Sequence, residues 1–293
     1  MLRVAAAQLA VTLDKADNLR RASALIAAAA KDGAAFVALP ECFTGKYGVS
    51  NFASWQESVV LQAVDGDEVS GGAAMMAAMA QRHGITVTGG IVERAPTQHP
   101  QDPVDLFNSM PVYGPSGRLL ANYRKVHLSR VLGVTSESDV FAAGDSATTV
   151  ELDDGMAVGM ACCFDLRFPA FLAAYGPYAV DGRGSERVDV LCAPSAFLEA
   201  TGVDHWNLLC QRAALDLQSY VVAPNVAFDA SDAVPLHGRS LVCDPWGSVL
   251  AQTGAEGDDL AIADVSKARI DEVRARLPLT SAAKGAHFKQ QFW

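Results

Sequence analysis

The chain has 293 residues, of which 50% are hydrophobic and 19% are charged, so it can bury a large core and is not a disordered chain. Its net charge of −10 argues against a nucleic-acid or anionic-membrane surface, because either partner requires a basic patch. We find no signal-peptide pattern and no uninterrupted apolar run long enough to span a membrane. We therefore expect a protein that acts on neither nucleic acid nor membrane.

The first third of the chain alternates between strand-like and helix-like patterns. Short apolar runs predict buried strands, and longer amphipathic runs that end near glycine predict helices. The predicted strands cover residues 2–9, 34–39 and 85–92, and the predicted helices cover 14–30, 51–60 and 67–82. Repeated strand–helix–strand units indicate an α/β sheet.

The middle of the chain is richer in hairpins and loops. Residues 94–105 predict a Pro-rich surface loop, and residues 125–144 predict a long loop of a kind that usually has a function. The predicted hairpins pair 106–113 with 118–123, and 148–152 with 156–161.

The last third returns to alternating elements. The predicted helices cover 168–175, 205–218 and 265–276, the predicted strands cover 188–193, 220–226, 238–243, 248–252 and 260–265, and a polar excursion covers 176–187. No repeat or linker divides the chain. We therefore predict one domain over residues 1–276, followed by an extended arm over residues 277–293.

The six cysteines lie in apolar or strand-like runs and show neither disulfide nor zinc-ligand spacing. Free thiols of this kind are typical of a reducing compartment, so we expect a cytoplasmic protein without a metal site. Cys42 and Cys162 are expected to be structural.

Cys163 is the candidate nucleophile, because it stands between a predicted strand and a helix start. Asp165 is the expected N-cap of that helix, and Pro169 suits its first turn. The helix dipole and Arg167 are expected to lower the pKa of the Cys163 thiol. The backbone N–H of Phe164 is expected to be free to donate to an oxyanion. Two buried core cysteines would fit this stretch equally well.

Three short strings share one feature, an ionisable residue just beyond a predicted strand. They are Leu39-Pro40-Glu41-Cys42-Phe43, Tyr123-Arg124-Lys125-Val126-His127-Leu128 and Cys163-Phe164-Asp165-Leu166-Arg167-Phe168-Pro169. Strand ends are where α/β sheets build their sites. We therefore expect Glu41, Lys125 and Cys163 to meet at one cleft.

Together the three strings resemble the Glu–Lys–Cys constellation of the nitrilase, or carbon–nitrogen hydrolase, superfamily. Further matching segments are Glu137-Ser138 with Gly144-Asp145, Pro194-Ser195-Ala196-Phe197 and the hairpin from Ser240 to Gly247, so the resemblance covers nearly the whole chain in order. It implies an α/β fold, a four-layer α-β-β-α sandwich with two sheets face to face. It also implies that no metal or organic cofactor is needed, and that the protein is a homodimer or higher homo-oligomer whose arm, residues 277–293, crosses to the partner.

The resemblance implies a role for each site residue. Cys163 attacks a carbon–nitrogen substrate, Glu41 carries protons and activates water, and Lys125 shares the oxyanion with the N–H of Phe164. Glu137 is a second carboxylate that orients the substrate amide or holds Lys125. The substrate-binding candidates are Tyr47, Arg167 and Phe197.

Within the superfamily, the nucleophile string is most similar to the ω-amidase and deaminated-glutathione-amidase branch. That branch hydrolyses the terminal amide of small dicarboxylic acid monoamides such as 2-oxoglutaramate, using water and releasing ammonia. Tyr47-Gly48 favours ω-amidase, whereas Phe164, the 176–187 excursion and Arg239 depart from the branch. An anionic substrate tail needs a cation, for which Arg167, Lys46 and Arg239 are candidates.

Three other interpretations stay open. His127, His205 or His237 could act as base in a Cys–His arrangement. The same catalytic residues could serve an N-carbamoyl amide hydrolase. The scaffold could also carry a non-catalytic or thiol-redox protein.

Overall fold

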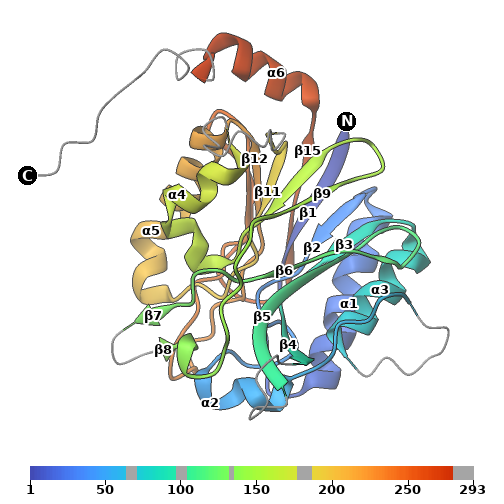
Figure 1. Cartoon of the computed structure of the whole chain (residues 1–293), viewed down its shortest axis with the longest axis vertical. Coiled ribbons are helices and arrows are strands. Elements are labelled where there is room, and N and C mark those ends of the chain that lie inside the picture. Colours follow the sequence, from blue (N-terminus) through green and yellow to red (C-terminus); the bar gives the residue numbers. More distant parts are fainter. Residues whose placement is uncertain (64–70, 97–103, 132–134, 177–186, 280–293) are drawn as a thin grey trace, which may run out of the picture.

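The computed structural model describes residues 1–63, 71–96, 104–131, 135–176 and 187–279. Two sheets pack face to face in the middle of the molecule, and helices cover their outer faces (Figure 1).

The first sheet has seven strands among the described residues. They are, in spatial order, β15 (Asp259–Val265), β1 (Leu2–Gln8), β2 (Phe36–Ala38), β3 (Thr86–Thr88), β5 (Val104–Tyr113) and β4 (Ile91–Pro96), with β6 (Leu119–Arg124) also pairing with β5. The central strands β1, β2 and β3 run parallel, and the flanking strands run antiparallel to their neighbours. The parallel centre brings the carboxyl ends of β1, β2 and β3 to one edge.

The second sheet has six strands in the described part of the chain. They are, in spatial order, β14 (Val249–Gln252), β13 (Leu241–Cys243), β12 (Tyr220–Ala223), β11 (Val190–Cys192), β10 (Ala157–Met160) and β9 (Thr148–Glu151). Here β10, β11 and β12 run parallel. A short separate pair is formed by β7 (Arg130–Val131) and β8 (Thr135–Ser136).

Two of the six α-helices of the described residues begin at a side-chain cap. They are α1 (Lys15–Lys31), α2 (Val49–Phe52), α3 (Gly72–His83), α4 (Pro169–Leu172), α5 (Glu199–Leu217) and α6 (Lys267–Arg276), with 3₁₀ turns η1 (Ala53–Trp55), η2 (Glu137–Asp139), η3 (Cys163–Arg167) and η4 (Ala173–Tyr175). Asp14 caps α1 by accepting from the N–H of Asp17, and Ser266 caps α6 by accepting from the N–H of Arg269.

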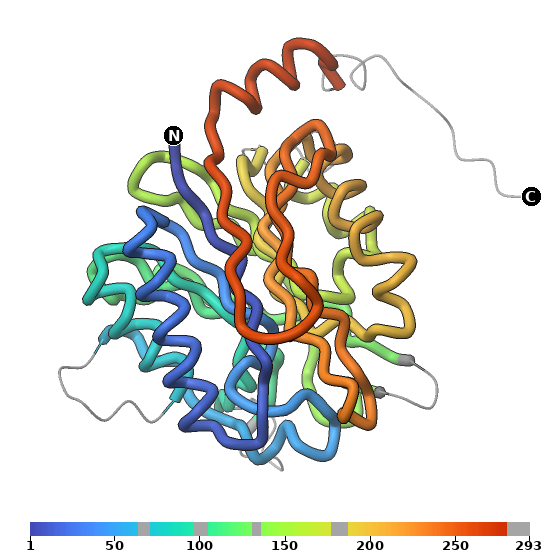
Figure 2. The backbone as a smooth tube through the Cα atoms, turned by 180° about the vertical axis from the view of Figure 1, so that it is seen from behind, coloured from blue at the N-terminus to red at the C-terminus, as the bar shows by residue number. Residues whose placement is uncertain are grey.

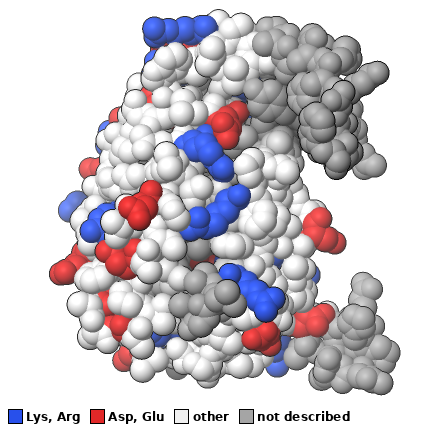
Figure 3. Space-filling model, turned by 90° about the vertical axis from the view of Figure 1, so that its left-hand side faces the viewer, with Lys and Arg blue, Asp and Glu red and all other residues white. Residues whose placement is uncertain are grey.

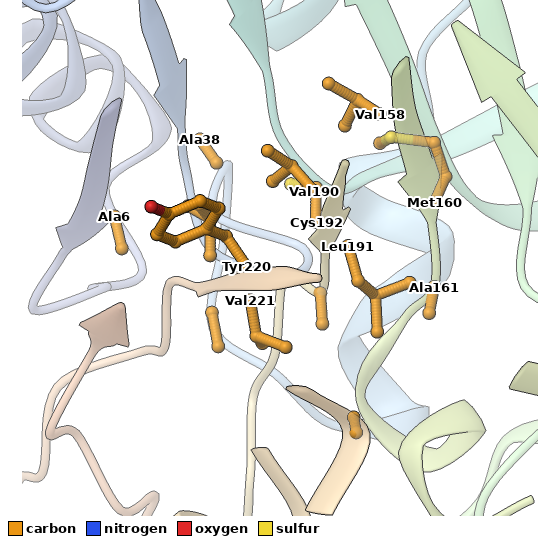
Figure 4. Packing of buried hydrophobic residues seen from close by; sticks show 14 of the residues in the cluster. Ala6, Ala38, Val158, Met160, Ala161, Val190, Leu191, Cys192, Tyr220 and Val221 are labelled. Atoms are coloured by element: carbon orange, nitrogen blue, oxygen red, sulfur yellow. The ribbon is translucent and has the colours of Figure 1, made fainter. Parts of the chain in front are cut away.

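Alternate residues of the strands face different layers. On β1, Val4 and Ala6 join the apolar cluster between the two sheets, whereas Ala5 and Ala7 join the cluster beneath α1 and α3. Side chains of β10, β11 and β12 fill the inter-sheet region beside Ala6 and Ala38 (Figure 4). With α5 packed behind the second sheet, the order of layers is α-β-β-α, and the predicted four-layer sandwich is confirmed.

Several predicted boundaries are wrong. The strand expected over 85–92 is two strands, β3 and β4, which part at Gly89 and Gly90 where the Glu41 turn packs against them. The helix expected over 67–82 begins at Gly72. In place of the helix expected over 51–60, the structure has the short α2 followed by η1, which ends at Trp55.

Two further corrections concern helices near the site. The helix expected over 205–218 begins six residues earlier, as α5, directly after Leu198, whose backbone is extended. Its first turns contain Gly202, where a Cβ would stand 2.3 Å from the ring of His237, so glycine serves packing here and does not end the helix. The helix expected over 168–175 is divided between α4 and η4.

Some predicted segments fall outside the described residues. These are 97–103 of the Pro-rich loop, most of the 176–187 excursion and residues 280–293 of the arm. The described C-terminal part runs along β1 as β15 and then continues as α6 beyond the end of the sheets (Figure 2).

All six cysteines are free and buried. No helix in the described ranges has the length and apolar character needed to cross a membrane. On the face that carries α4 and α5, basic and acidic side chains are interspersed (Figure 3).

Candidate active site

Glu41 lies in a tight turn directly after β2, at the carboxyl edge of the first sheet. The turn is held by Gly90, whose N–H donates to the carbonyl of Pro40 at 2.9 Å and whose carbonyl accepts from Phe43 at 3.1 Å. A Cβ at position 90 would stand 2.5 Å from the Cα of Glu41, so only glycine permits this approach. The break between β3 and β4 therefore positions Glu41.

Lys125 follows β6 without a break and is fixed by backbone bonds on both sides. Its N–H donates to the carbonyl of Asn108, and its carbonyl accepts from Gly144, each at 2.8 Å. The residue is only 1% exposed. Its ammonium group therefore has to be neutralised by protein groups.

Two buried carboxylates neutralise Lys125. Its Nζ lies 2.7 Å from Oε1 of Glu41 and 2.9 Å from Oε2 of Glu137. Asn108 donates to Oε1 of both carboxylates, at 2.7 and 3.2 Å. The hydroxyl of Tyr47 adds a 2.8 Å hydrogen bond to Glu137. The two carboxylates together carry more negative charge than Lys125 neutralises, and hydrogen bonds from Asn108 and Tyr47 stabilise the remainder.

The protonation states of the central pair follow from these contacts. Burial raises the pKa of Glu41, but the charge of Lys125 and hydrogen bonds from Lys125, Cys162 and Asn108 outweigh it, so the pKa lies below its usual value. Burial lowers the pKa of Lys125, but Glu137 and Glu41 outweigh it, so the pKa lies well above its usual value. The resting site holds a carboxylate and an ammonium.

Cys163 begins the 3₁₀ turn η3 just after β10, at the edge of the second sheet. Its φ of +46° lies in the left-handed region, which a non-glycine residue adopts at a cost of about 1–3 kcal/mol. Its N–H donates to the carbonyl of Pro194 at 3.0 Å. The N–H of Ala196 donates to Oε2 of Glu41 at 2.7 Å. A backbone amide that follows β11 thus ties the Glu41 carboxylate to the second sheet.

The expected lowering of the Cys163 pKa is wrong. Burial and the charge of Glu41 raise the pKa of the thiol well above its usual value, against the opposing effects of Lys125 and Ala196. The expectation relied on a long helix dipole, whereas η3 has only five residues. Cys163 therefore rests as a thiol and needs a base to become a nucleophile.

Asp165 is not an N-cap, because Cys162 holds that position. Its Oδ2 accepts from the N–H of Cys162 at 2.8 Å and from the hydroxyl of Tyr123 at 2.6 Å. Its Oδ1 accepts from the N–H of His127 at 2.9 Å. The carboxylate thus ties the Cys163 turn to the segment that carries Lys125.

A cavity of about 170 Å³ opens beside Cys163. Its lining includes the predicted substrate-binding residues Tyr47, Arg167 and Phe197 together with Phe164. The guanidinium of Arg167 lies 5.0 Å from the ring centre of Phe197 and 5.9 Å from that of Phe164. The N–H of Phe164 makes no hydrogen bond to any described residue, as expected for an amide at the start of a helical turn.

The three candidate cations differ in their partners. Lys46 is paired with Asp229 and Asp232, and Arg239 lies 3.5 Å from Glu199. Arg167 forms no ion pair with a carboxylate in the part of the chain that the structure describes.

Two of the three candidate histidine bases, His127 and His237, are engaged by carboxylates. His127 hydrogen-bonds Asp165 and stacks on a phenylalanine ring, and His237 hydrogen-bonds Glu199. His205 lies 3.3 Å from Arg167 in the cavity wall.

Several groups that complete the site are not among the residues predicted from the sequence. Asn108 is the most important, because it donates to both Glu41 and Glu137. The feature of the sequence that could have indicated it is a polar amide side chain in the middle of the predicted strand that became β5. The backbone N–H groups of Ser129 and Ala196, which bind Glu137 and Glu41, have no side-chain signal. Within the described ranges, no group of three or more His, Cys, Asp or Glu side chains is arranged to hold a metal ion.

This four-layer fold, with a cysteine, two glutamates and a lysine gathered where its two sheets meet, defines the nitrilase-like class of proteins. The chain matches the carbon–nitrogen hydrolase family over residues 3–275 and belongs to that family. The resemblance drawn from the motifs is confirmed, and so is the prediction of an enzyme that hydrolyses carbon–nitrogen bonds.

Curated relatives cover almost the whole chain. The omega-amidase NIT2 of Homo sapiens is 32% identical over 281 residues, which is 94% of this chain and 93% of the relative. The omega-amidase NIT2 of Bos taurus is 33% identical over 283 residues, or 95% and 94%.

Solved structures of lower sequence identity also cover almost the whole chain. Nit3 of Saccharomyces cerevisiae, a member of branch 10 of the nitrilase superfamily, superposes with a TM-score of 0.77 at 27% identity and 95% coverage of both chains. XC1258 of Xanthomonas campestris, a CN-hydrolase superfamily protein with an arsenic adduct in its active site, superposes with a TM-score of 0.79 at 25% identity and 99% coverage of both.

Proposed function

We propose that the protein is a cysteine-dependent amidohydrolase of the ω-amidase type. It hydrolyses the terminal amide of a small dicarboxylic acid monoamide through an acyl-thioester intermediate and releases ammonia. The observation that supports this most is the buried Glu41–Lys125–Glu137 cluster next to the strained Cys163, at a cavity lined by Arg167, which pairs with no carboxylate of the described residues. The similarity to the NIT2 omega-amidases supports the choice of amide.

In the acylation half, the Cys163 sulfur attacks the amide carbon while Glu41 accepts the thiol proton. Lys125 and the N–H of Phe164 stabilise the negative charge that develops on the carbonyl oxygen. Glu41 then gives the proton to the amide nitrogen, the carbon–nitrogen bond breaks and ammonia leaves. A thioester to Cys163 and an ionised Glu41 remain.

In the deacylation half, Glu41 takes a proton from a water molecule that attacks the thioester carbon. The carbon–sulfur bond breaks, the carboxylic acid departs, and the proton on Glu41 returns to the sulfur. Glu137 takes no proton in this scheme, because its contacts serve to hold Lys125 and Tyr47 in place.

Arg167 supports the choice of an anionic substrate. Lys46 and Arg239 already have carboxylate partners, whereas Arg167 faces the cavity that contains Cys163. A substrate carboxylate at Arg167 would place the far end of a short chain at the sulfur. We expect Arg167→Gln to raise KM for a dicarboxylic monoamide by about 10- to 100-fold and to leave a neutral amide such as butyramide unaffected.

The function is tested by ammonia release from 2-oxoglutaramate and succinamate at pH 7, with Cys163→Ala as control. Intact-mass detection of an acyl adduct on Cys163 tests the thioester. Absence of ammonia from both monoamides refutes the substrate assignment. Cleavage of N-carbamoyl amino acids instead identifies a carbamoyl amide hydrolase, and peroxide-dependent disulfide formation at Cys163 without any hydrolysis identifies a redox protein.

We also propose a homodimer in the cytoplasm. The outer side of α5 exposes Leu208 (65%) and Leu215 (48%), which lie seven residues apart on one face of the helix and suit contact with a second copy. Sedimentation equilibrium tests this, and a Leu208→Glu variant is expected to shift the protein toward the monomer.

A further inference from the structure

Cys162 directly precedes the proposed nucleophile, and its thiol contacts the proposed base. The side chain is fully buried, and its sulfur lies 3.2 Å from Oε1 of Glu41 and 3.9 Å from Oδ1 of Asn108. Burial and the charge of Glu41 raise the pKa of Cys162 well above its usual value, so the group is a neutral S–H donor. The Cys162 thiol takes no part in the proposed acylation and deacylation steps.

Four groups of the described residues donate to the Glu41 carboxylate. Its Oε1 accepts from Lys125 and Asn108, each at 2.7 Å, and from Cys162. Its Oε2 accepts from the N–H of Ala196. The ammonium, the side-chain NH₂ and the backbone N–H can only donate. The thiol differs from them, because its hydrogen rotates and its sulfur also accepts.

This difference matters while Glu41 holds the proton taken from Cys163. A protonated carboxyl group is itself a donor, and a group that can only donate gives it no acceptor. Cys162 can turn its hydrogen toward Oδ1 of Asn108 and offer a sulfur lone pair to Glu41. Both protonation states of Glu41 then have a partner at this position.

We propose that Cys162 is a positioning residue, which holds the Glu41 carboxylate against Lys125 and sets the pH range over which Glu41 acts as base. This inference rests on the proposed function, in which Glu41 receives the thiol proton. It assigns Cys162 no contact with substrate.

Other titratable groups also face Glu41 and are kept when Cys162 is replaced. They are Lys125 after β6, Glu137 in η2, Cys163 in η3, and Cys42 and Tyr47 from the segment that follows Glu41. Cys162 also acts on the pKa of Lys125, and both Cys162→Ala and Cys162→Ser remove that effect. A change in pH dependence that Cys162→Ala shows and Cys162→Ser does not is therefore traceable to the lost donor.

The size of the effect follows from what one donor does to a carboxylate. A backbone N–H lowers the pKa of a carboxylate by about 0.6–1 unit, and a thiol is a weaker donor. We expect Cys162→Ala to move the acid limb of the pH profile upward by about half a pH unit. Cys162→Ser keeps a rotatable group that donates and accepts, so we expect its acid limb at or below that of the unmodified protein.

The test measures the rate at which iodoacetamide alkylates Cys163 in the full chain from about pH 3 to pH 8, a range that begins well below the usual glutamate pKa. Peptide mapping assigns the labelled cysteine, so the readout does not depend on the substrate. Cys243→Ala is the matched control, because Cys243 is equally buried in β13 and its sulfur makes no hydrogen bond to any described residue.

The expected result is an upward shift in Cys162→Ala alone. An acid limb in Cys162→Ala that coincides with that of Cys243→Ala overturns the inference. If Cys162→Ala does not fold, Cys162→Val, which fills the site without a donor, is compared with Cys162→Ser. A Glu41→Gln variant that retains the unmodified profile overturns the proposed role of Glu41 instead, so the two failures are distinguishable.

Discussion

Replacing Lys125 with methionine tests whether this ammonium holds the site together. The variant keeps the stem of the side chain but leaves Glu41 and Glu137 buried without the cation that lies 2.7 and 2.9 Å from them. Removing one partner of a buried ion pair costs about 3–5 kcal/mol. For a chain of this size we expect the melting temperature to fall by about 6–10 °C at pH 8.

The loss should depend on pH. In the unmodified protein the pKa of Glu41 is lowered, so its contribution to stability is complete above the unfolded pKa and is flat between pH 5 and pH 8. Without Lys125, burial raises the pKa of this carboxyl group above its unfolded value. Stability is then lost as pH rises toward the folded pKa, by up to about 1.4 kcal/mol per pH unit. The fall in melting temperature at pH 5 is therefore expected to be about half of that at pH 8.

Differential scanning calorimetry at the two pH values measures both effects. Lys267→Met is the control, because Lys267 has a side chain that is 53% exposed and lies 3.7 Å from Asp189. We expect a change of no more than about 2 °C for that variant at either pH. Equal losses at pH 5 and pH 8 for Lys125→Met, or a loss as small as the control's, would refute the proposed electrostatic role.

Three further predictions follow from single contacts. Glu41→Gln should lower kcat by about 10²- to 10⁴-fold with an unchanged circular dichroism spectrum, because the amide cannot accept the thiol proton; a smaller loss contradicts its role as base. Gly90→Ala should lower the free energy of unfolding by about 1–3 kcal/mol in urea titrations, because its Cβ would stand 2.5 Å from the Cα of Glu41. Gly254→Ala, where a Cβ meets no atom within 4 Å, should be neutral, and equal effects of the two would refute the steric argument. Tyr47→Phe removes the 2.8 Å hydrogen bond to Glu137 and should cost about 1–3 kcal/mol; an unchanged urea midpoint contradicts it.

The strands, most of the helices and the meeting of the charged groups could be predicted from short patterns. Apolar runs predict buried strands, and an ionisable residue just beyond such a run lies at a sheet edge. This logic places Glu41 near Lys125, which the structure brings to 2.7 Å. The resemblance to a family supplied the sandwich, since hydrophobic patterns alone do not specify how two sheets pack.

The remaining features depend on contacts between distant segments. The sign of the Cys163 pKa shift is one, because burial and Glu41, 122 positions away in the sequence, reverse what the local helix start suggests. The break at Gly90 is another, since its cause is the backbone of Glu41 rather than any neighbour in sequence. Asn108 and the amide of Ala196 are donors whose importance only their partners reveal.

The candidate site is divided between the two sheets. Glu41 and Lys125 extend from the first, and Cys163 and Ala196 extend from the second. Neither sheet alone carries a complete set of reacting groups. The rate of turnover therefore depends on how closely the two sheets pack against each other. Mild urea or pressure that shifts one sheet relative to the other by about an ångström should abolish activity, while the circular dichroism of the strands stays unchanged.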